Sequence, residues 1–99
     1  MNKTLIALSV ACLGMTLSAQ SMAASSTLET VKARGQLICG VNTAAPGFAS
    51  VDSKGNWTGL DVDVCRAVAA ATLGDASKVK FVPLSSPQRF TALQAGEID

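Results

Sequence analysis

The stretch GNWTGLDVDVCRAVAAA, residues 55–71, decides how the rest of the chain is arranged. Gly55 and Gly59 allow the backbone angles of a tight turn, and Trp57 stands between them in the pattern of an exposed residue. The alternative for Trp57 is that it covers the start of the helix. The run that follows is rich in alanine and poor in charge, which predicts a long helix from about Asp61 to Leu73. The other elements are expected before and after this helix.

Both ends of this helix carry residues that are typical of helix termini. Thr58 or Asp61 is expected to accept hydrogen bonds from the first free amides, and Gly74 is expected to close the far end. Only Asp63 and Arg66 interrupt the apolar surface of the helix. A helix with so little charge needs other structure over it, so the pattern predicts a buried helix within an α/β fold.

A strand is expected on each side of the helix. Residues 36–41 are apolar on both faces, as in a strand buried within a parallel sheet, and residues 78–82 form the second strand. Strand, helix and strand in this order imply parallel strands joined by a crossover. Residues 42–54 are expected to form a loop. In open parallel sheets ligands bind beyond the carboxyl ends of the strands, so residues 41–48 and 84–89 are the candidate binding loops.

Capping signals predict two further helices. Ser26 followed by Glu29 forms a capping box for a short helix near the start of the folded part. Ser86 at the cap, with Pro87 in the first turn, predicts another helix, which Gly96 ends. The apolar face of this second helix is expected to hold Phe90, Ala92 and Leu93.

The order of these elements predicts an α/β fold with a βαβα arrangement and parallel strands. Residues 97–99 are expected to begin a further strand. A sheet with only two complete strands leaves an edge unpaired and a helix half covered. We therefore expect an incomplete fold, in which residues 24–99 are the N-terminal part of a longer protein.

The first residues have the pattern of a secretory signal peptide. Lys3 supplies the basic start, residues 5–17 supply the apolar run, and Ser21 and Ala23 are the small residues that signal peptidase requires. Cleavage after Ala23 would make residues 1–23 the signal peptide and would export the remainder. A membrane anchor is the alternative, but the apolar run is shorter than the roughly 20 residues that span a bilayer.

Charge and composition argue against several classes of function. The net charge is +1, without a run of like charges or a basic face, so nothing indicates nucleic acid as a partner. The chain has no histidine, which removes histidine-based metal sites and nucleophiles from these residues. Asp61 and Asp63 make a poor catalytic pair because residues two apart on a helix do not face each other. No catalytic residue, metal site or cofactor is expected.

Arg89 is the most informative single charge. It is expected about three residues into a helix, where the positive end of the helix dipole disfavours a cation by up to ~1 kcal/mol. An anion that binds there would offset this cost. Arg89, Ser86 and the free amides of the helix start would then form a carboxylate site. A solvated arginine or a surface salt bridge is the alternative.

Two loop residues are further candidates for ligand contact. Phe48 stands among small and polar residues and would give a wall for an apolar part of a ligand, unless it anchors the loop in the core. Asn42 directly follows the first strand and carries both donors and acceptors. The alternative for Asn42 is an Asx turn that orders the loop.

Three cysteines are present, of which Cys12 would leave with the signal peptide. Cys39 is expected on the first strand and Cys65 on the helix that packs against it. In an oxidising compartment such an even pair is a disulfide candidate. Two buried free thiols are the alternative.

Several of these segments together resemble one protein family. LICGV at residues 37–41, PGF at residues 46–48 and the stretch 55–68 resemble the amino-acid-binding periplasmic proteins of ABC importers, solute-binding protein family 3. KFVPL at residues 80–84 and RFTALQAGEID at residues 89–99 extend the resemblance over the whole segment that follows the signal peptide. Within the family, the general L-amino-acid-binding branch resembles the chain most.

The resemblance implies a periplasmic-binding-protein-like fold of type II, in which two α/β lobes close on one amino acid. Residues 24–99 would be the first part of the N-terminal lobe. The implied function is to capture polar or general L-amino acids in the periplasm and to deliver them to the membrane permease of an ABC importer. It implies no enzymatic activity. A sensor module of a membrane receptor and a dehydratase-like enzyme are the alternatives on the same scaffold.

The resemblance also implies where the ligand binds. Ser86 and Arg89 match a serine and an arginine that contact the ligand in related glutamate/aspartate binders. Asn42 stands where those binders have an arginine, and this departure indicates a broader choice of ligands. Phe48 is the fourth expected contact. The family's partners for the α-carboxylate and α-ammonium groups would lie beyond Asp99.

Overall fold

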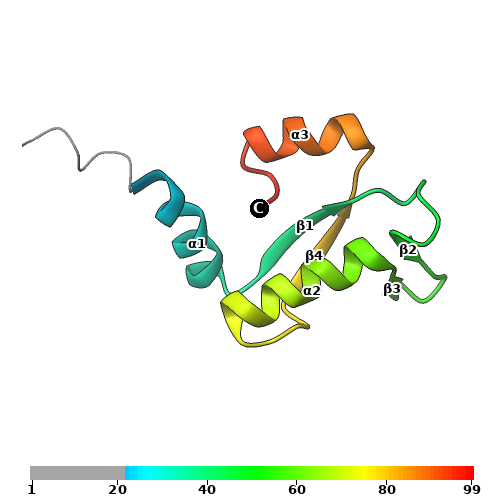
Figure 1. The fold of residues 1–99 in the computed structure, drawn as a ribbon, viewed down its shortest axis with the longest axis horizontal. Helices are drawn as coiled ribbons and strands as arrows, with labels where there is room; N and C mark the ends of the chain where they lie inside the picture. Colours follow the sequence, from blue (N-terminus) through cyan, green and yellow to red (C-terminus); the bar gives the residue numbers. More distant parts are fainter. Residues whose placement is uncertain (1–21) are drawn as a thin grey trace, which may run out of the picture.

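The structure, a computed structural model, describes residues 22–99 and consists of three helices and four strands. In chain order these are α1 (Met22–Arg34), β1 (Leu37–Val41), β2 (Ser50–Val51), β3 (Trp57–Thr58), α2 (Leu60–Leu73), β4 (Val79–Pro83) and α3 (Ser86–Gln94) (Figure 1). The signal peptide expected over residues 1–23 lies outside the described residues, apart from its last two.

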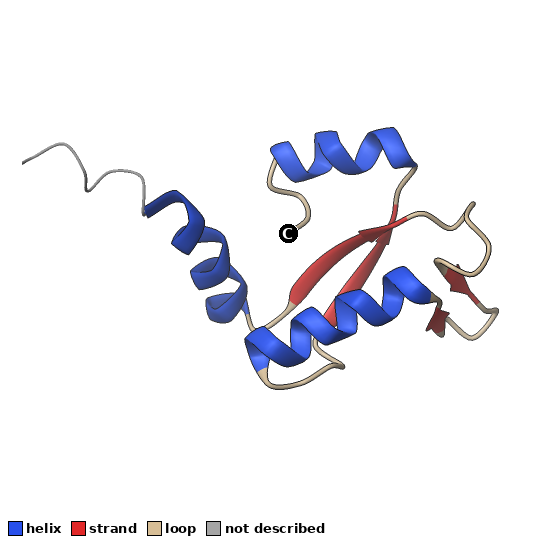
Figure 2. Ribbon diagram, viewed as in Figure 1, coloured by secondary structure: helices blue, strands red, loops and turns tan. Residues whose placement is uncertain are grey.

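The central sheet pairs β1 with β4 in parallel, as the order of the elements predicts. The register runs from Leu37 opposite Val79 to Val41 opposite Pro83. Helix α2 connects the two strands and α3 follows β4, and the two helices lie on opposite sides of this sheet (Figure 2). The expected βαβα arrangement with parallel strands is therefore confirmed.

The core lies between the sheet and α2. One cluster of buried side chains joins Val31 of α1, Leu37 of β1 and Ala69 of α2. A second cluster joins Val41, Val62 and Ala49. Alternate residues of β1 thus face α2, and Cys65 packs against both clusters. β1 is apolar on both faces because α2 covers one side of the sheet and α3 lies on the other.

The start of α2 is closed by the backbone of the preceding loop. The amide of Leu60 donates to the Gly47 carbonyl at 3.0 Å, and the amide of Asp61 donates to the Phe48 carbonyl at 2.9 Å. The N-cap residue is Gly59, and no side chain caps the helix. The expectation that Thr58 or Asp61 caps the helix is therefore wrong, because loop carbonyls occupy the amides that a side chain would have satisfied.

The other end of α2 follows the prediction. Gly74 takes the left-handed conformation, with φ of 73°, and its amide donates to the Ala70 carbonyl at 2.9 Å. A glycine accepts this conformation without the steric cost that a Cβ atom would add.

Two helix faces are less covered than their sequences predict. In α2 only Val62 and Ala69 are buried. In α3 only Ala92 is buried. The large apolar residues that stay exposed on these two helices are Leu60, Val64, Val68, Phe90 and Leu93. Among residues 22–99, no helix has both the length and the apolar character needed to cross a membrane.

The segment expected as a loop supplies β2, one strand of a small hairpin with β3 that the sequence does not reveal. Ser50 pairs with Thr58 and Val51 with Trp57 in an antiparallel register. The Asp52 carboxylate orders the turn by accepting hydrogen bonds from the Asn56 side chain and from backbone amides. These bonds, that of the Asn56 side chain above all, lower the pKa of Asp52.

Trp57 is held by this hairpin against the core rather than exposed. Its ring lies 5.4 Å from the ring of Phe81, centroid to centroid, and it belongs to the cluster around Val41. The Arg66 side chain donates to the Trp57 carbonyl at 2.9 Å and lies over the Phe81 ring. Trp57 is therefore not an exposed turn residue; its ring covers the core near the start of α2, which is the alternative stated for it.

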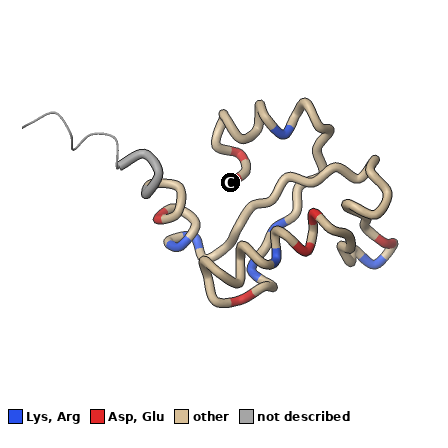
Figure 3. The backbone as a smooth tube through the Cα atoms, viewed as in Figure 1, with Lys and Arg blue, Asp and Glu red and all other residues tan. Residues whose placement is uncertain are grey.

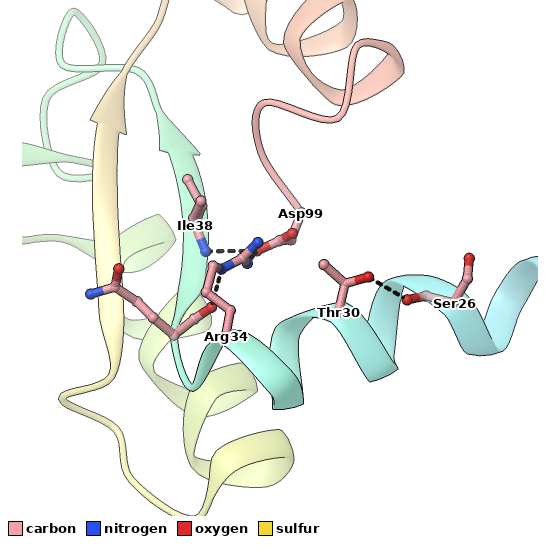
Figure 4. Close-up of polar contacts among 6 residues, drawn as sticks. Ser26, Thr30, Arg34, Ile38 and Asp99 are labelled. Carbon is pink, nitrogen blue, oxygen red and sulfur yellow. Dashed lines mark hydrogen bonds and ion pairs between the residues drawn. The ribbon is translucent and has the colours of Figure 1, made fainter.

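Helix α1 begins earlier than the capping signal predicts. It starts at Met22, and Ser26 already lies inside it, where its carbonyl accepts the Thr30 hydroxyl at 2.8 Å. A capping role for Ser26 is therefore wrong. The last turn of α1 is fixed by Arg34, whose guanidinium pairs with the Asp99 carboxylate and donates to the Gln36 carbonyl at 2.9 Å (Figure 4).

Ile98 and Asp99 lie beside β1 without forming a regular strand, whereas the Glu97 amide still donates to the Ala92 carbonyl of α3. The Asp99 amide donates to the Ile38 carbonyl at 2.9 Å, and its carboxylate accepts the Ile38 amide at 2.8 Å (Figure 4). The expected strand is thus present only as one backbone bond of a ladder. The Asp99 side chain takes the amide that a neighbouring strand would otherwise take.

A disulfide joins Cys39 of β1 to Cys65 of α2, with their Cα atoms 6.3 Å apart. This separation lies within the range that disulfides span. The bond connects the sheet to the middle of the helix that covers it and adds a covalent link between the two core clusters.

We expect Gly59→Ala to destabilise the protein strongly. Gly59 has φ of 127° and ψ of 171°, a region that essentially only glycine adopts, and an added Cβ would lie 2.3 Å from the Phe48 carbonyl oxygen. Backbone strain and the steric clash together should cost at least about 2 kcal/mol of unfolding free energy. Denaturant unfolding of the full-length protein measures this loss.

Gly55→Ala is the matched control for this substitution. Gly55 also has a positive φ, of 84°, but no atom lies within 4 Å of the place where its Cβ would stand. It should lose only about 1 kcal/mol. Equal losses for the two variants would show that the close approach of Gly59 to Phe48 does not matter.

We expect Cys39 and Cys65 to be oxidised in the purified protein. After digestion without reductant, mass spectrometry should find the two peptides joined, and reduction should separate them. The bond closes a loop with a sequence separation of 26, and its loss should cost roughly 3–4 kcal/mol of unfolding free energy in the chain-entropy account. Free thiols at both positions before reduction would contradict the prediction.

Candidate functional site

The site is built where the two parallel strands end. The Leu84 amide donates to the Val41 carbonyl at 2.8 Å and so continues the β1–β4 ladder by one bond beyond the register of the sheet. This bond holds the segment before α3 beside the first residues after β1. The candidate loops at 41–48 and 84–89 therefore leave the sheet side by side.

Helix α3 begins one residue before the position that the sequence predicts. Its N-cap is Ser85, whose amide donates to the Gln88 side-chain oxygen at 2.9 Å. Ser86 is the first helical residue, so its expected role as the cap is wrong. Because Ser85 occupies the N-cap position, the Ser86 hydroxyl does not cap the helix and instead contacts Asn42 in the neighbouring loop.

Asn42 links the two loops. Its side-chain oxygen accepts the Ala44 amide at 2.9 Å, which is the Asx turn considered as an alternative to ligand binding. Its side-chain nitrogen donates to the Ser86 hydroxyl oxygen at 3.0 Å. The Asx turn fixes the orientation of the amide, and the amide in turn fixes Ser86.

Arg89 completes this row of polar side chains. One guanidinium nitrogen lies 3.5 Å from the Ser86 hydroxyl oxygen, and the other lies 3.7 Å from a carboxylate oxygen of Asp61. The arginine is thus in the salt bridge that was weighed against ligand binding. Both side chains of this pair are 34% exposed, so solvent and solutes reach them.

Gly40 gives Arg89 the room to lie across the sheet. A Cβ atom at Gly40 would stand 2.8 Å from the Ile98 side chain and 3.6 Å from the Cγ atom of Arg89. The aliphatic stem of the arginine therefore passes over a position without a side chain. Sequence reasoning gave Gly40 no part in the site, because its lack of a side chain matters only once α3 is placed over β1.

Phe48 lies at the exposed side of the same region. Its side chain is 49% exposed, so it does not anchor the loop in the core, which was the alternative for this residue. Its carbonyl accepts the Asp61 amide. Because the Asp61 carboxylate pairs with Arg89, the backbone of Phe48 is linked through Asp61 to one end of the row formed by Asn42, Ser86 and Arg89.

The two aspartates of α2 serve different arginines. Asp61 pairs with Arg89 of α3, whereas Asp63 lies 3.3 Å from Arg66 on the same helix. The Asp63 side chain is 73% exposed and the Asp61 side chain only 34%. Acidic and basic residues are otherwise spread over the helices and loops (Figure 3). Sequence reasoning missed Asp61 as a neighbour of the site, since the pairing joins two helices that only the fold brings together.

A separate hollow of about 480 Å³ lies between β1, α2 and α3. Most of its lining is apolar, and it includes Leu37, Cys39, Val68, Phe90, Leu93 and Ile98. Arg89 is one of its lining residues, so the hollow adjoins the polar row, but Asn42, Phe48 and Ser86 do not line it. Its lining suits apolar side chains, whereas the polar groups that suit a zwitterion gather at the strand ends.

Comparison with known proteins agrees with this architecture. Residues 37–99 match the family described as bacterial extracellular solute-binding proteins, family 3. The chain is 57% identical over 79 residues to the general L-amino acid-binding periplasmic protein AapJ of Rhizobium johnstonii, covering 80% of this chain and 23% of AapJ. It is 61% identical over 77 residues to the glutamate/glutamine/aspartate/asparagine-binding protein BztA of Rhodobacter capsulatus, covering 78% of this chain and 23% of BztA.

Solved structures show the same likeness. A periplasmic binding protein of an ABC transporter from Brucella ovis, with glutathione bound, superposes with a TM-score of 0.70 and 63% identity. The match covers 74% of this chain and 23% of that one. With the parallel βαβα arrangement, this likeness confirms the expected α/β fold of type II periplasmic binding proteins.

The scaffold is also found in an enzyme. An ancestral cyclohexadienyl dehydratase superposes with a TM-score of 0.62 and 36% identity, over 73% of this chain and 29% of that one. AapJ and BztA, in contrast, are named as binding proteins. The chain spans 23% of the length of each of these two relatives.

Proposed function

This chain belongs to the bacterial extracellular solute-binding proteins of family 3, and we propose that it captures L-amino acids for an ABC-type importer. The names of AapJ and BztA support an amino acid as the ligand. In this role the protein hands its ligand to the membrane permease subunits of the importer. Its place of action is the periplasm, and residues 1–23 act as the cleaved signal peptide that directs it there.

The observation that carries the proposal is the row of polar side chains at the carboxyl ends of β1 and β4. Asn42, Ser86 and Arg89 lie within reach of one another there, and the arginine is partly exposed. Arg89 supplies a cation, and Ser86 supplies a hydroxyl that both donates and accepts. Phe48 supplies an exposed aromatic wall.

These groups suit a polar side chain of an amino acid better than an apolar one. An arginine gives charge-assisted hydrogen bonds to a carboxylate and ordinary ones to an amide oxygen. Asn42 occupies the place of a second arginine in the glutamate/aspartate binders that this chain resembles. With asparagine in place of that arginine, the site should accept neutral polar amino acids as well as acidic ones.

Binding without catalysis fits the described residues best. The sequence has no histidine, and in residues 22–99 the carboxylate beside the row, that of Asp61, pairs with Arg89. The dehydratase among the structural relatives keeps an enzyme as the second candidate. Release of product from a cyclic amino-acid precursor, in an assay without added permease, would favour that candidate.

We expect the full-length protein to bind polar L-amino acids with micromolar or tighter affinity. Isothermal titration with the common L-amino acids measures this directly. Glutamate, glutamine, aspartate and asparagine should all bind, because one arginine beside hydroxyl and amide groups serves both charged and neutral side chains. Absence of heat for every amino acid would overturn the proposed function.

Arg89→Gln tests the proposed site within the same titration. Loss of the guanidinium should weaken glutamate binding at least about tenfold, since charge-assisted hydrogen bonds contribute roughly 1.5–3 kcal/mol each. Lys80→Gln is the control, because it removes the same charge from an exposed position of β4. An unchanged glutamate affinity in Arg89→Gln would place the ligand elsewhere.

A further inference from the structure

The ion pair between Asp61 and Arg89 places an anion of the protein beside the cation that a ligand is proposed to use. The two groups lie 3.7 Å apart and come from the first turns of two different helices, α2 and α3. No side chain caps α2, so the Asp61 carboxylate has no bond to the helix start that would explain its presence. Among the described residues, its side chain pairs with that of Arg89.

Arg89 needs a nearby anion for a physical reason. It lies in the first turn of α3, where the exposed amides and the helix dipole disfavour a cation. The amides at the start of α2 are occupied by the carbonyls of Gly47 and Phe48, so the Asp61 carboxylate remains available to the arginine. The Asp61 carboxylate thus offsets the unfavourable position of the Arg89 cation, a role that the sequence alone assigns to a bound anion.

The pair is weak enough to open. Each side chain is about one-third exposed, and the closest nitrogen and oxygen are beyond hydrogen-bond distance. Exposed or half-exposed ion pairs shift an equilibrium by a factor of about five at most. An anionic ligand can therefore replace Asp61 as the partner of Arg89. The ligand's carboxylate then lies close to the Asp61 carboxylate, and the two negative charges repel each other.

We propose that Asp61 is a specificity-determining residue, which lowers the affinity of the site for acidic relative to neutral polar amino acids. The inference rests on the proposed amino-acid site. A ligand carboxylate competes with Asp61 for Arg89 and is repelled by it. A ligand amide binds Ser86 and Arg89 without disturbing the ion pair. Asp61 thereby broadens a site in which Arg89 would otherwise favour acids.

The test compares the affinities of the full-length protein for L-glutamate and L-glutamine, two ligands of nearly the same shape. Asp61→Asn should raise the ratio of glutamate to glutamine affinity at least about threefold, because it removes both the competition and the repulsion. Asp61→Ser provides the same test with a residue that suits a helix start, in case the first variant does not fold.

Asp63→Asn is the matched control. It removes the same charge from the same helix, but Asp63 faces Arg66 and is largely exposed. The ratio of glutamate to glutamine affinity in Asp63→Asn should stay within about twofold of the wild-type ratio. Isothermal titration measures all four proteins, and thermal unfolding shows that each is folded.

The outcomes separate the inference from the proposed function. An unchanged ratio in both Asp61 variants, with the wild type binding normally, overturns the inference alone. An equal fall in the affinities for glutamate and glutamine in the Asp61 variants also overturns the inference, because a purely structural role would give that result. A rise in the affinity ratio for Asp63→Asn as large as that for Asp61→Asn overturns it as well. A wild type that binds no amino acid overturns the proposed function and the inference with it.

Discussion

The contact between the loop backbone at Gly47 and Phe48 and the start of α2 is the constraint on which the rest of the site depends. Two carbonyls of the loop accept the first two amides of the helix, at 3.0 Å and 2.9 Å. This approach is possible because Gly59 has no Cβ atom. It fixes the far end of the loop that begins at Asn42, and it frees the side chain of Asp61 from capping.

The site follows from this contact and from the sheet. The β1–β4 ladder, extended by the bond between Leu84 and Val41, sets Asn42 beside Ser86. The amide of Asp61 is bonded to the loop, and the Asp61 carboxylate pairs with Arg89. Each polar side chain is thus positioned by backbone bonds of a neighbouring element. Such support favours a preorganised site, which binds with less cost for ordering its side chains.

The sequence was sufficient for the order of the main elements, and the two loops that it proposes for ligand binding lie side by side in the structure. Apolar periodicity and the Gly74 signal located α2, and the parallel pairing of β1 with β4 followed from the strand–helix–strand order. The details at the helix starts were not predictable in the same way. Thr58, Asp61 and Ser86 all have the chemistry of caps, but loop carbonyls and Ser85 took those roles. Which acceptor bonds the free amides at a helix start depends on tertiary contacts that no local sequence pattern encodes.

A crystal structure of the full-length protein with L-glutamine bound tests the central claim most directly. The account predicts that a polar atom of the ligand lies within hydrogen-bond distance of the Ser86 hydroxyl or of the Arg89 guanidinium, beyond the carboxyl ends of β1 and β4, with Phe48 beside it. A ligand bound without contact to either residue would contradict the account.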